Sequence, residues 1–288
     1  MNRTIEAIRI IAVILISFTH TRHNFEEGVI STLLNDIPKF GTLILSIVSG
    51  YLFIKISYAK KDIMGKKIKS LLIPFLTANL FVIAPVLLLH LLGFDYLNRL
   101  SYDYTILTQG LFSLSSPPIN PPTYFVRDLF IIFLLIDLFA NNNFKTLTIL
   151  LPVVIFGKLL LRYDILFLFL SGVIFGKHEE KFTFVKTLLT VTLLSIVSFN
   201  YFRYYLMFFL FTQVVKIEIN FPKTGRYSYL LHLYHSPIIV FTYPIITIFV
   251  KNPYMNLVLQ LGLTFFIIYL LNKVISRFEK LKFITGGR

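Results

Sequence analysis

The sequence contains no cysteine and few charged residues. The lack of cysteine excludes disulfides, thiolate metal sites and an acyl-cysteine intermediate. Only 15% of the 288 residues are charged and 56% are apolar, against about 25% and about 45–50% in soluble domains. Together with a mean hydropathy of +0.76, this balance excludes an ordinary soluble protein and predicts an integral membrane protein.

Apolar runs separated by charged residues, proline and asparagine predict a transmembrane bundle of about ten helices, because each span needs about 20 apolar residues. The fold class is therefore all-α, and residues 1–288 are expected to form a single membrane domain. No metal-ligand spacing, nucleotide-binding glycine loop or internal repeat is visible. The expected spans are 4–21, 39–58, 70–92, 123–140, 144–161, 163–177, 184–200, 203–218, 226–250 and 255–275.

The chain is strongly basic, with 28 Lys and Arg against 14 Asp and Glu. In a membrane protein such an excess collects in cytoplasmic loops and does not indicate nucleic-acid binding. With the N-terminus inside, 19 basic residues fall in cytoplasmic segments and 7 in outside loops of the ten-span map. Both termini are therefore predicted to be cytoplasmic. The basic segment from Lys55 to Lys69 either anchors this topology or binds a polyanionic cofactor.

The longest loop, 93–122, lies outside on this map and contains the sequence PPINPP, residues 117–122. Proline at this density stiffens a segment without building a core. The loop is interpreted either as a lid over an external site or as a plain connector.

Charged residues within membrane spans are costly, so they are functional candidates. The first expected span contains Arg9 and His20. Eleven residues at about 100° each bring them within about 20° of one helix face, about 16 Å apart along the axis. Arg9 near the cytoplasmic side could bind phosphate, and His20 near the outer side could remove a proton from an attacking hydroxyl. The alternative is a snorkelling arginine and an interfacial histidine.

Five segments in order resemble acyltransferase family 3, the multi-span membrane acyltransferases of surface polysaccharides. They are Arg9 followed by His20, VSGYLF at 48–53, basic residues before LLIPF at 71–75, YFVRDLFIIFLL at 124–135 and YSYLLHLYHSPI at 227–238. The resemblance implies ten helices, cytoplasmic termini, acetyl-CoA as acyl donor and a carbohydrate acceptor. It also implies that Arg9 and His20 are the functional pair.

The resemblance further implies cofactor contacts by Lys66, Lys67 and Lys69, although Lys66 and Lys69 stand where the family usually has arginine. Lysine attracts phosphate as a point charge but lacks the bidentate geometry of arginine. Tyr124, a candidate for binding the acceptor, stands where the family often has tryptophan, a residue absent from this chain.

Arg127 and Asp128 lie near the outer end of the fourth expected span, at about the predicted depth of His20. As catalytic residues, Asp128 would orient the imidazole or pair with Arg127, and Arg127 would stabilise the oxyanion. The alternative is a structural ion pair that fixes helix packing.

Three further residues have both a structural and a functional interpretation. Ser49 and Gly50 either permit close helix packing or accommodate the pantetheine arm of the donor, with Ser49 as a hydrogen-bond donor. His232 is interpreted as a packing or polar-lining residue that contacts the acceptor, because the sequence supplies no further ligands for a metal.

The sequence thus predicts a bacterial inner-membrane enzyme that transfers an acetyl group from cytoplasmic acetyl-CoA to a hydroxyl of a cell-surface or lipid-linked glycan. One alternative is a transporter or flippase that uses Arg9, His20, Arg127 and Asp128 as a proton or substrate pathway. Another is a scaffold without catalysis. The acceptor, the acylated position, the acyl group, O- against N-acylation and the oligomeric state stay open.

Overall fold

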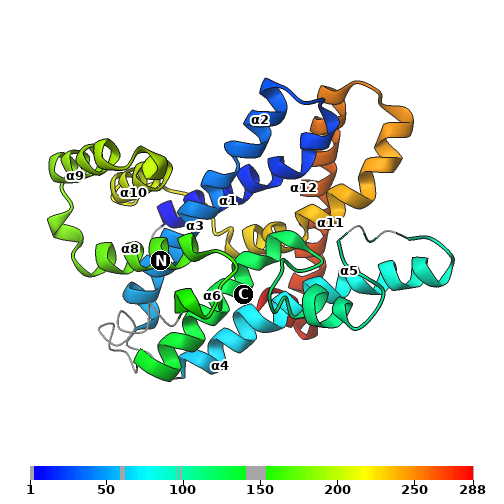
Figure 1. Ribbon diagram of the computed structural model, residues 1–288, viewed down its shortest axis with the longest axis horizontal. Helices are drawn as coiled ribbons and strands as arrows, with labels where there is room; N and C mark the ends of the chain where they lie inside the picture. Colours follow the sequence, from blue (N-terminus) through cyan, green and yellow to red (C-terminus); the bar gives the residue numbers. More distant parts are fainter. Residues whose placement is uncertain (1–2, 59–61, 96, 98, 141–153, 288) are drawn as a thin grey trace. The chain divides into compact units, whose positions relative to one another are not determined.

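The computed structural model describes residues 3–58, 62–95, 97, 99–140 and 154–287. The described residues contain no strand, and 80% of the structure is helical. The expected all-α class is therefore confirmed. The α-helices, in chain order in Figure 1, are α1 Arg3–Phe18, α2 Val29–Asp36, α3 Lys39–Leu52, α4 Ile63–Lys67, α5 Ile73–Leu91, α6 Tyr124–Leu135, α8 Tyr163–Lys177, α9 Phe184–Val197, α10 Phe202–Val214, α11 Gly225–Phe249 and α12 Pro253–Arg277.

Among the described residues, five helical segments are long and apolar enough to cross a membrane. They are Arg3–Asn24, Val29–Ser57, Ile63–Leu91, Gly225–Phe249 and Pro253–Arg277, and they coincide with five of the expected spans. Helices α6, α8, α9 and α10 occupy four other expected spans. With 12 to 15 residues each, they are shorter than these five segments. For example, the 14 residues of α9 extend about 21 Å at 1.5 Å per residue. The expected span 144–161 lies mostly outside the described residues. The described part of the chain thus supports five of the ten expected spans.

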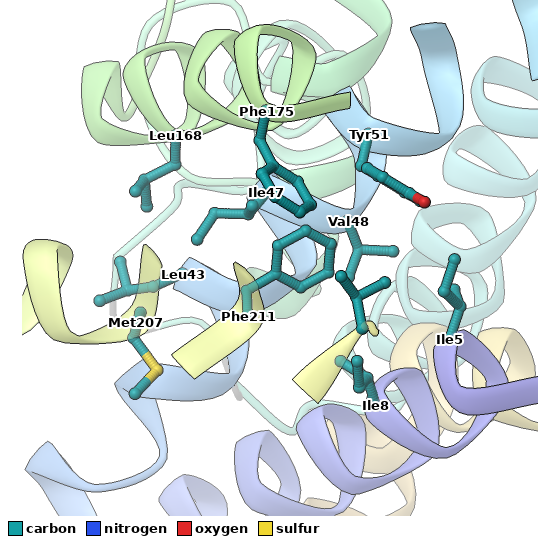
Figure 2. Packing of buried hydrophobic residues seen from close by; sticks show 11 residues of the cluster. Ile5, Ile8, Leu43, Ile47, Val48, Tyr51, Leu168, Phe175, Met207 and Phe211 are labelled. Carbon is teal, nitrogen blue, oxygen red and sulfur yellow. The ribbon is translucent and has the colours of Figure 1, made fainter. Parts of the chain in front are cut away.

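The chain, expected from its composition to form one domain, divides into two compact units. The first comprises Met1–Lys61 and Asp164–Ser228. In it, α1 packs on α3, α3 on α10, and α10 on α9. Figure 2 shows the apolar core between α1, α3, α8 and α10. In it, Tyr51 stacks on Phe175 at 5.7 Å between ring centroids, and Phe211 meets both rings edge-on. These offset and edge-to-face arrangements are the favourable ones for aromatic pairs.

The second unit comprises Asp62–Tyr163 and Tyr229–Arg288. Here α6 packs against α4 and the π-helical segment Ile68–Leu72 that follows it. The start of α12 is capped by Asn252, whose side chain accepts hydrogen bonds from the main-chain N–H groups of Tyr254 and Met255 at 3.0 and 3.1 Å, with Pro253 as its first residue.

Candidate functional site

In the first unit, Arg9 lies beside an acidic residue that the sequence reasoning missed. Glu6, one turn earlier on α1, is buried, and its Oε1 lies 3.8 Å from Nη1 of Arg9. The Arg9 side chain is 16% exposed, so the pair lies largely away from solvent. An acidic residue three positions before an arginine in an apolar run was the available signal, because residues three apart share a helix face.

The segment between α10 and α11 is fastened along the first turns of α1. Arg3 donates to the carbonyl oxygen of Phe221 at 2.7 Å, and the Thr4 hydroxyl donates to that of Ile217. The main-chain N–H of Thr224 donates to Oε2 of Glu6 at 2.9 Å. The linker thereby brings the start of α11 next to Arg9.

His20 lies outside the α-helical part of the first span. Helix α1 ends at Phe18, and His20 belongs to the 3-10 segment Thr19–Asn24, where it is half-buried. A 3-10 helix has 3.0 residues per turn, so each residue advances about 120° instead of the about 100° assumed for a common face. The common face predicted for Arg9 and His20 assumes a continuous α-helix. That geometry holds only as far as Phe18.

Gly50 lies at a close approach of α3 and α8. A Cβ at this position would be 1.8 Å from the carbonyl oxygen of Phe169, which belongs to the backbone of α8. Ser49 donates to the carbonyl oxygen of Leu45 in its own helix at 2.8 Å. For Gly50, these contacts favour the interpretation as a close helix contact. The backbone of α8 occupies the space that a pantetheine arm would need there.

In the second unit, the basic run lies at the start of the third expected span. Lys66 and Lys69 are exposed and Lys67 is half-buried. The Nζ atom of Lys67 lies 3.8 Å from the centroid of the Phe133 ring, a distance at which a cation is attracted to the ring face. Lys66 and Lys69 are thus the more accessible to an anion.

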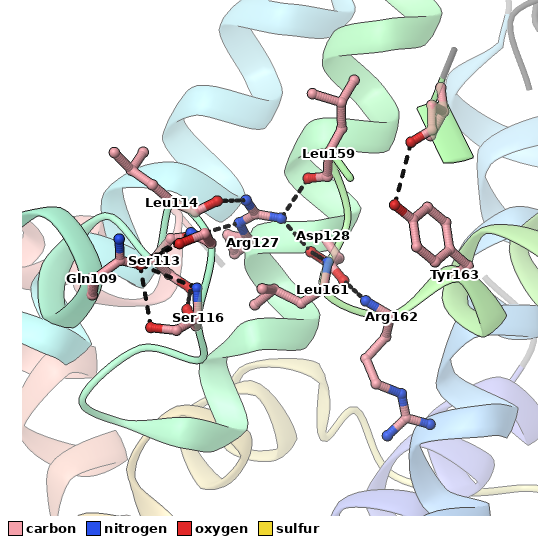
Figure 3. A network of polar contacts seen from close by, with 12 residues as sticks. Gln109, Ser113, Leu114, Ser116, Arg127, Asp128, Leu159, Leu161, Arg162 and Tyr163 are labelled. Atoms are coloured by element: carbon pink, nitrogen blue, oxygen red, sulfur yellow. Dashed lines mark hydrogen bonds and ion pairs between the residues drawn. The ribbon is translucent and has the colours of Figure 1, made fainter. Parts of the chain in front are cut away.

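Arg127, in the first turn of α6, holds two separate segments of the chain (Figure 3). Its Nε donates to the carbonyl oxygen of Ser113 at 3.0 Å and its Nη2 to that of Leu114 at 3.0 Å. Its Nη1 donates to Leu159 O at 2.8 Å and to Asp128 Oδ1 at 2.7 Å. Since arginine has five N–H donors, four are already committed to protein oxygens.

Asp128 continues the same network and is fully buried. Besides Arg127, it accepts hydrogen bonds from the main-chain N–H groups of Leu161 at 3.2 Å and Arg162 at 2.9 Å. A carboxylate with this many donors is satisfied without a further partner. The contacts of both residues favour the structural interpretation of the pair, in which α6 is fastened to the segments at 113–114 and 159–162.

The proline-containing loop is also held by its own side chains. Arg99 donates to the carbonyl oxygens of Pro117 at 2.5 Å and Pro118 at 2.7 Å. Oε1 of Gln109 accepts from the main-chain N–H groups of Ser115 and Ser116, as Figure 3 shows on its left side. The loop is therefore fixed in a defined conformation at several points.

Arg99→Ala is expected to loosen this loop, because it removes two charge-assisted hydrogen bonds to the carbonyl oxygens of Pro117 and Pro118. Limited proteolysis of the purified protein should cut within 99–120 several times faster than in the wild type. Tyr104→Ala, at an exposed position of the same loop, should leave the cleavage rate unchanged. Equal rates for the wild type and Arg99→Ala would show that Arg99 does not hold the loop.

The start of α6 also faces α11 within the second unit. The buried His232 meets Phe125 edge-on, with 5.6 Å between ring centroids. Tyr124 is half-buried, and the Arg162 guanidinium lies 5.8 Å from its ring centroid. His232 thus packs against the helix that carries Arg127 and Asp128, as its packing interpretation predicts.

A buried cluster of amide and hydroxyl groups lies beside these residues and was not anticipated. Asn79 of α5 donates to Thr123 Oγ1 at 3.1 Å and accepts from the Asn120 main-chain N–H at 3.1 Å. The Asn120 side chain donates to the carbonyl oxygen of Leu233 at 2.8 Å. The cluster joins α5, the proline-containing loop and α11, and asparagine within an apolar span was the signal for it.

No group of three His, Cys, Asp or Glu in the described part of the chain could hold a metal ion. Comparisons of the chain with known protein families, with curated proteins and with solved structures find no match.

Proposed function

We propose that the protein is a membrane O-acyltransferase that transfers an acetyl group from cytoplasmic acetyl-CoA to a hydroxyl of a cell-surface or lipid-linked glycan. One observation supports this above the others: the segments that resemble acyltransferase family 3 contain buried polar side chains within apolar helices. Arg127, Asp128 and His232 are each no more than 8% exposed. Such residues are expensive in a membrane and mark functional regions.

The donor is assigned to Arg9 and the lysines. A guanidinium binds the oxygens of a phosphate in a bidentate fork, and Arg9 is paired with the buried Glu6. Lys66, Lys67 and Lys69 are assigned to donor phosphates by the resemblance. Ser49 keeps its proposed contact with the donor as a hydrogen-bond acceptor, because its own O–H donates to the carbonyl oxygen of Leu45. Gly50 serves the packing of α3 on α8.

His20 is assigned as the general base. It would take the proton of the acceptor hydroxyl while the hydroxyl oxygen attacks the thioester carbonyl carbon. Breaking the C–S bond then releases the thiolate of CoA, which receives the proton from the imidazole, so that the products are the acetyl ester and CoA thiol. Arg127 was expected to stabilise the oxyanion; with four donors committed, its proposed role is to fix the start of α6, which carries Tyr124 as an acceptor contact.

The proposal includes a multi-pass arrangement in a bacterial inner membrane, with about ten spans and both termini in the cytoplasm. The distribution of Lys and Arg supports this orientation under the positive-inside rule. The five described helices of sufficient length support a membrane location.

His20→Ala is expected to abolish acetyl transfer, lowering the rate at least about 100-fold, the contribution typical of a general base. The measurement is incorporation of labelled acetyl from acetyl-CoA into glycan by membranes with matched amounts of folded protein. His178→Ala is the control, because His178 follows α8, outside the 3-10 segment of His20, and the variant should retain wild-type activity.

Full activity of His20→Ala would remove His20 from the mechanism. Absence of transfer by the wild type itself, despite folded protein and a supply of glycan, would favour the transporter in which the same charged residues form a pathway.

A further inference from the structure

Glu6 is a buried carboxylate to which the proposed reaction gives no role. Its relative exposure is 1%. In the sequence of α1 it falls between Ile5 and Ile8, two residues of the apolar core that Figure 2 shows. Removing a carboxylate from water is costly unless it is paired and hydrogen-bonded. The residue must therefore gain its compensation from the groups around it.

The two oxygens of Glu6 meet different partners. Oε2 accepts the hydrogen bond from the main-chain N–H of Thr224 at 2.9 Å, and Oε1 faces Nη1 of Arg9 at 3.8 Å. Residue 225, the first of α11, is a glycine, and a Cβ there would lie 3.4 Å from both Arg9 Nη1 and Glu6 Oε2. The start of α11 is thus packed directly on the Glu6–Arg9 pair.

We propose that Glu6 is a positioning residue for Arg9: it orients the guanidinium that binds the donor phosphate by holding it against the start of α11. This inference rests on the proposed function. An arginine side chain has about 2 kcal/mol of rotamer entropy, and a neighbouring carboxylate of fixed position reduces the number of orientations that the guanidinium can adopt. The donor then meets a preorganised binding group.

A purely structural role for Glu6 would consist of anchoring the linker alone. Thr4 offers the matched control, since it also fastens the linker, through Ile217 and Ile219, and its own helix places it away from the Arg9 contact. Anchoring alone predicts that Thr4→Val and Glu6 variants have the same consequences.

The experiment compares wild type, Glu6→Gln, Glu6→Asp, Thr4→Val and Arg9→Ala in the acetyl-transfer assay, and measures the rise in unfolding temperature that CoA alone causes. Glutamine keeps an oxygen for the Thr224 N–H but lacks the charge. Glu6→Gln is expected to raise KM for acetyl-CoA about tenfold with little change in kcat, the sign of lost binding common to ground and transition states. It should also reduce the CoA-induced rise in unfolding temperature.

Glu6→Asp, which keeps the charge, should recover part of the affinity, and Thr4→Val should retain the wild-type KM. If Glu6→Gln fails to fold, Glu6→Asp is compared with Thr4→Val instead. Equal KM values for acetyl-CoA in these two variants would then overturn the inference. An unchanged KM in Glu6→Gln overturns it, and so does a lower one, which would mean that Glu6 merely neutralises Arg9. If Arg9→Ala raises KM and Glu6→Gln does not, this inference alone fails. If the wild type neither binds CoA nor transfers acetyl, the proposed function fails.

Discussion

Replacing Asp128 by alanine is expected to lower the free energy of unfolding by about 3–5 kcal/mol, the usual cost of removing one partner of a buried ion pair. The substitution leaves Arg127 buried without its carboxylate and deprives the N–H groups of Leu161 and Arg162 of their acceptor. The expected result is a large loss of folded protein and a lower unfolding temperature of what is recovered. Unfolding in mixed detergent micelles gives the measurement.

Two variants separate a structural role of Asp128 from a catalytic one. Asp137→Ala removes an exposed acid from the π-helical continuation of α6 and should leave stability unchanged. Asp128→Asn keeps an oxygen for Arg127. Its free energy of unfolding should lie between those of the wild type and Asp128→Ala, and its turnover per folded molecule should be normal. Lost turnover at undiminished stability would contradict the structural role and restore the catalytic one.

Gly50→Ala is expected to destabilise the first unit by about 3 kcal/mol or more, at or above the usual range for overpacking a core. The added methyl group would meet the Phe169 carbonyl oxygen at 1.8 Å. Because the obstacle is helix backbone rather than a flexible side chain, α3 and α8 must separate to admit it. The unfolding temperature and the yield of monodisperse protein in detergent measure the effect.

Gly262→Ala is the matched control for this prediction. A Cβ at Gly262 of α12 would have no neighbour within 4 Å, and alanine in a helix interior is about 0.5–1 kcal/mol better than glycine. This variant should be as stable as the wild type or slightly more so. Equal stability of Gly50→Ala and Gly262→Ala would contradict the close approach of α3 and α8.

The class of fold and the five long helices could be predicted from the sequence, because composition and the length of apolar runs can be read without knowing which distant residues meet. The exact lengths of α6, α8, α9 and α10 could not be predicted in this way. Hydropathy does not reveal that α6 passes into a π-helical segment at Ile136, or that α9 ends at Val197 before the 3-10 segment Phe199–Tyr201. Local changes of helix type shorten an α-helix without changing its apolar character.

The candidate site was predicted where it depends on residue type and missed where it depends on distant partners. Arg127 and Asp128 stood out as charges in an apolar run. That their partners are main-chain groups at 113–114 and 159–162 follows only from the fold. The position of Glu6 three residues before Arg9 was a local signal. Its contacts with Thr224 and Gly225 follow only from the fold, which brings these residues to α1 from far along the sequence.

The central claim is acetyl transfer, and its most direct test is to supply labelled acetyl-CoA and glycan acceptor to membranes that contain the protein and to membranes that lack it. The account predicts an alkali-labile acetyl ester on the glycan only where the protein is present, together with release of CoA. Unlabelled glycan in the presence of folded protein, acceptor and acetyl-CoA would contradict it.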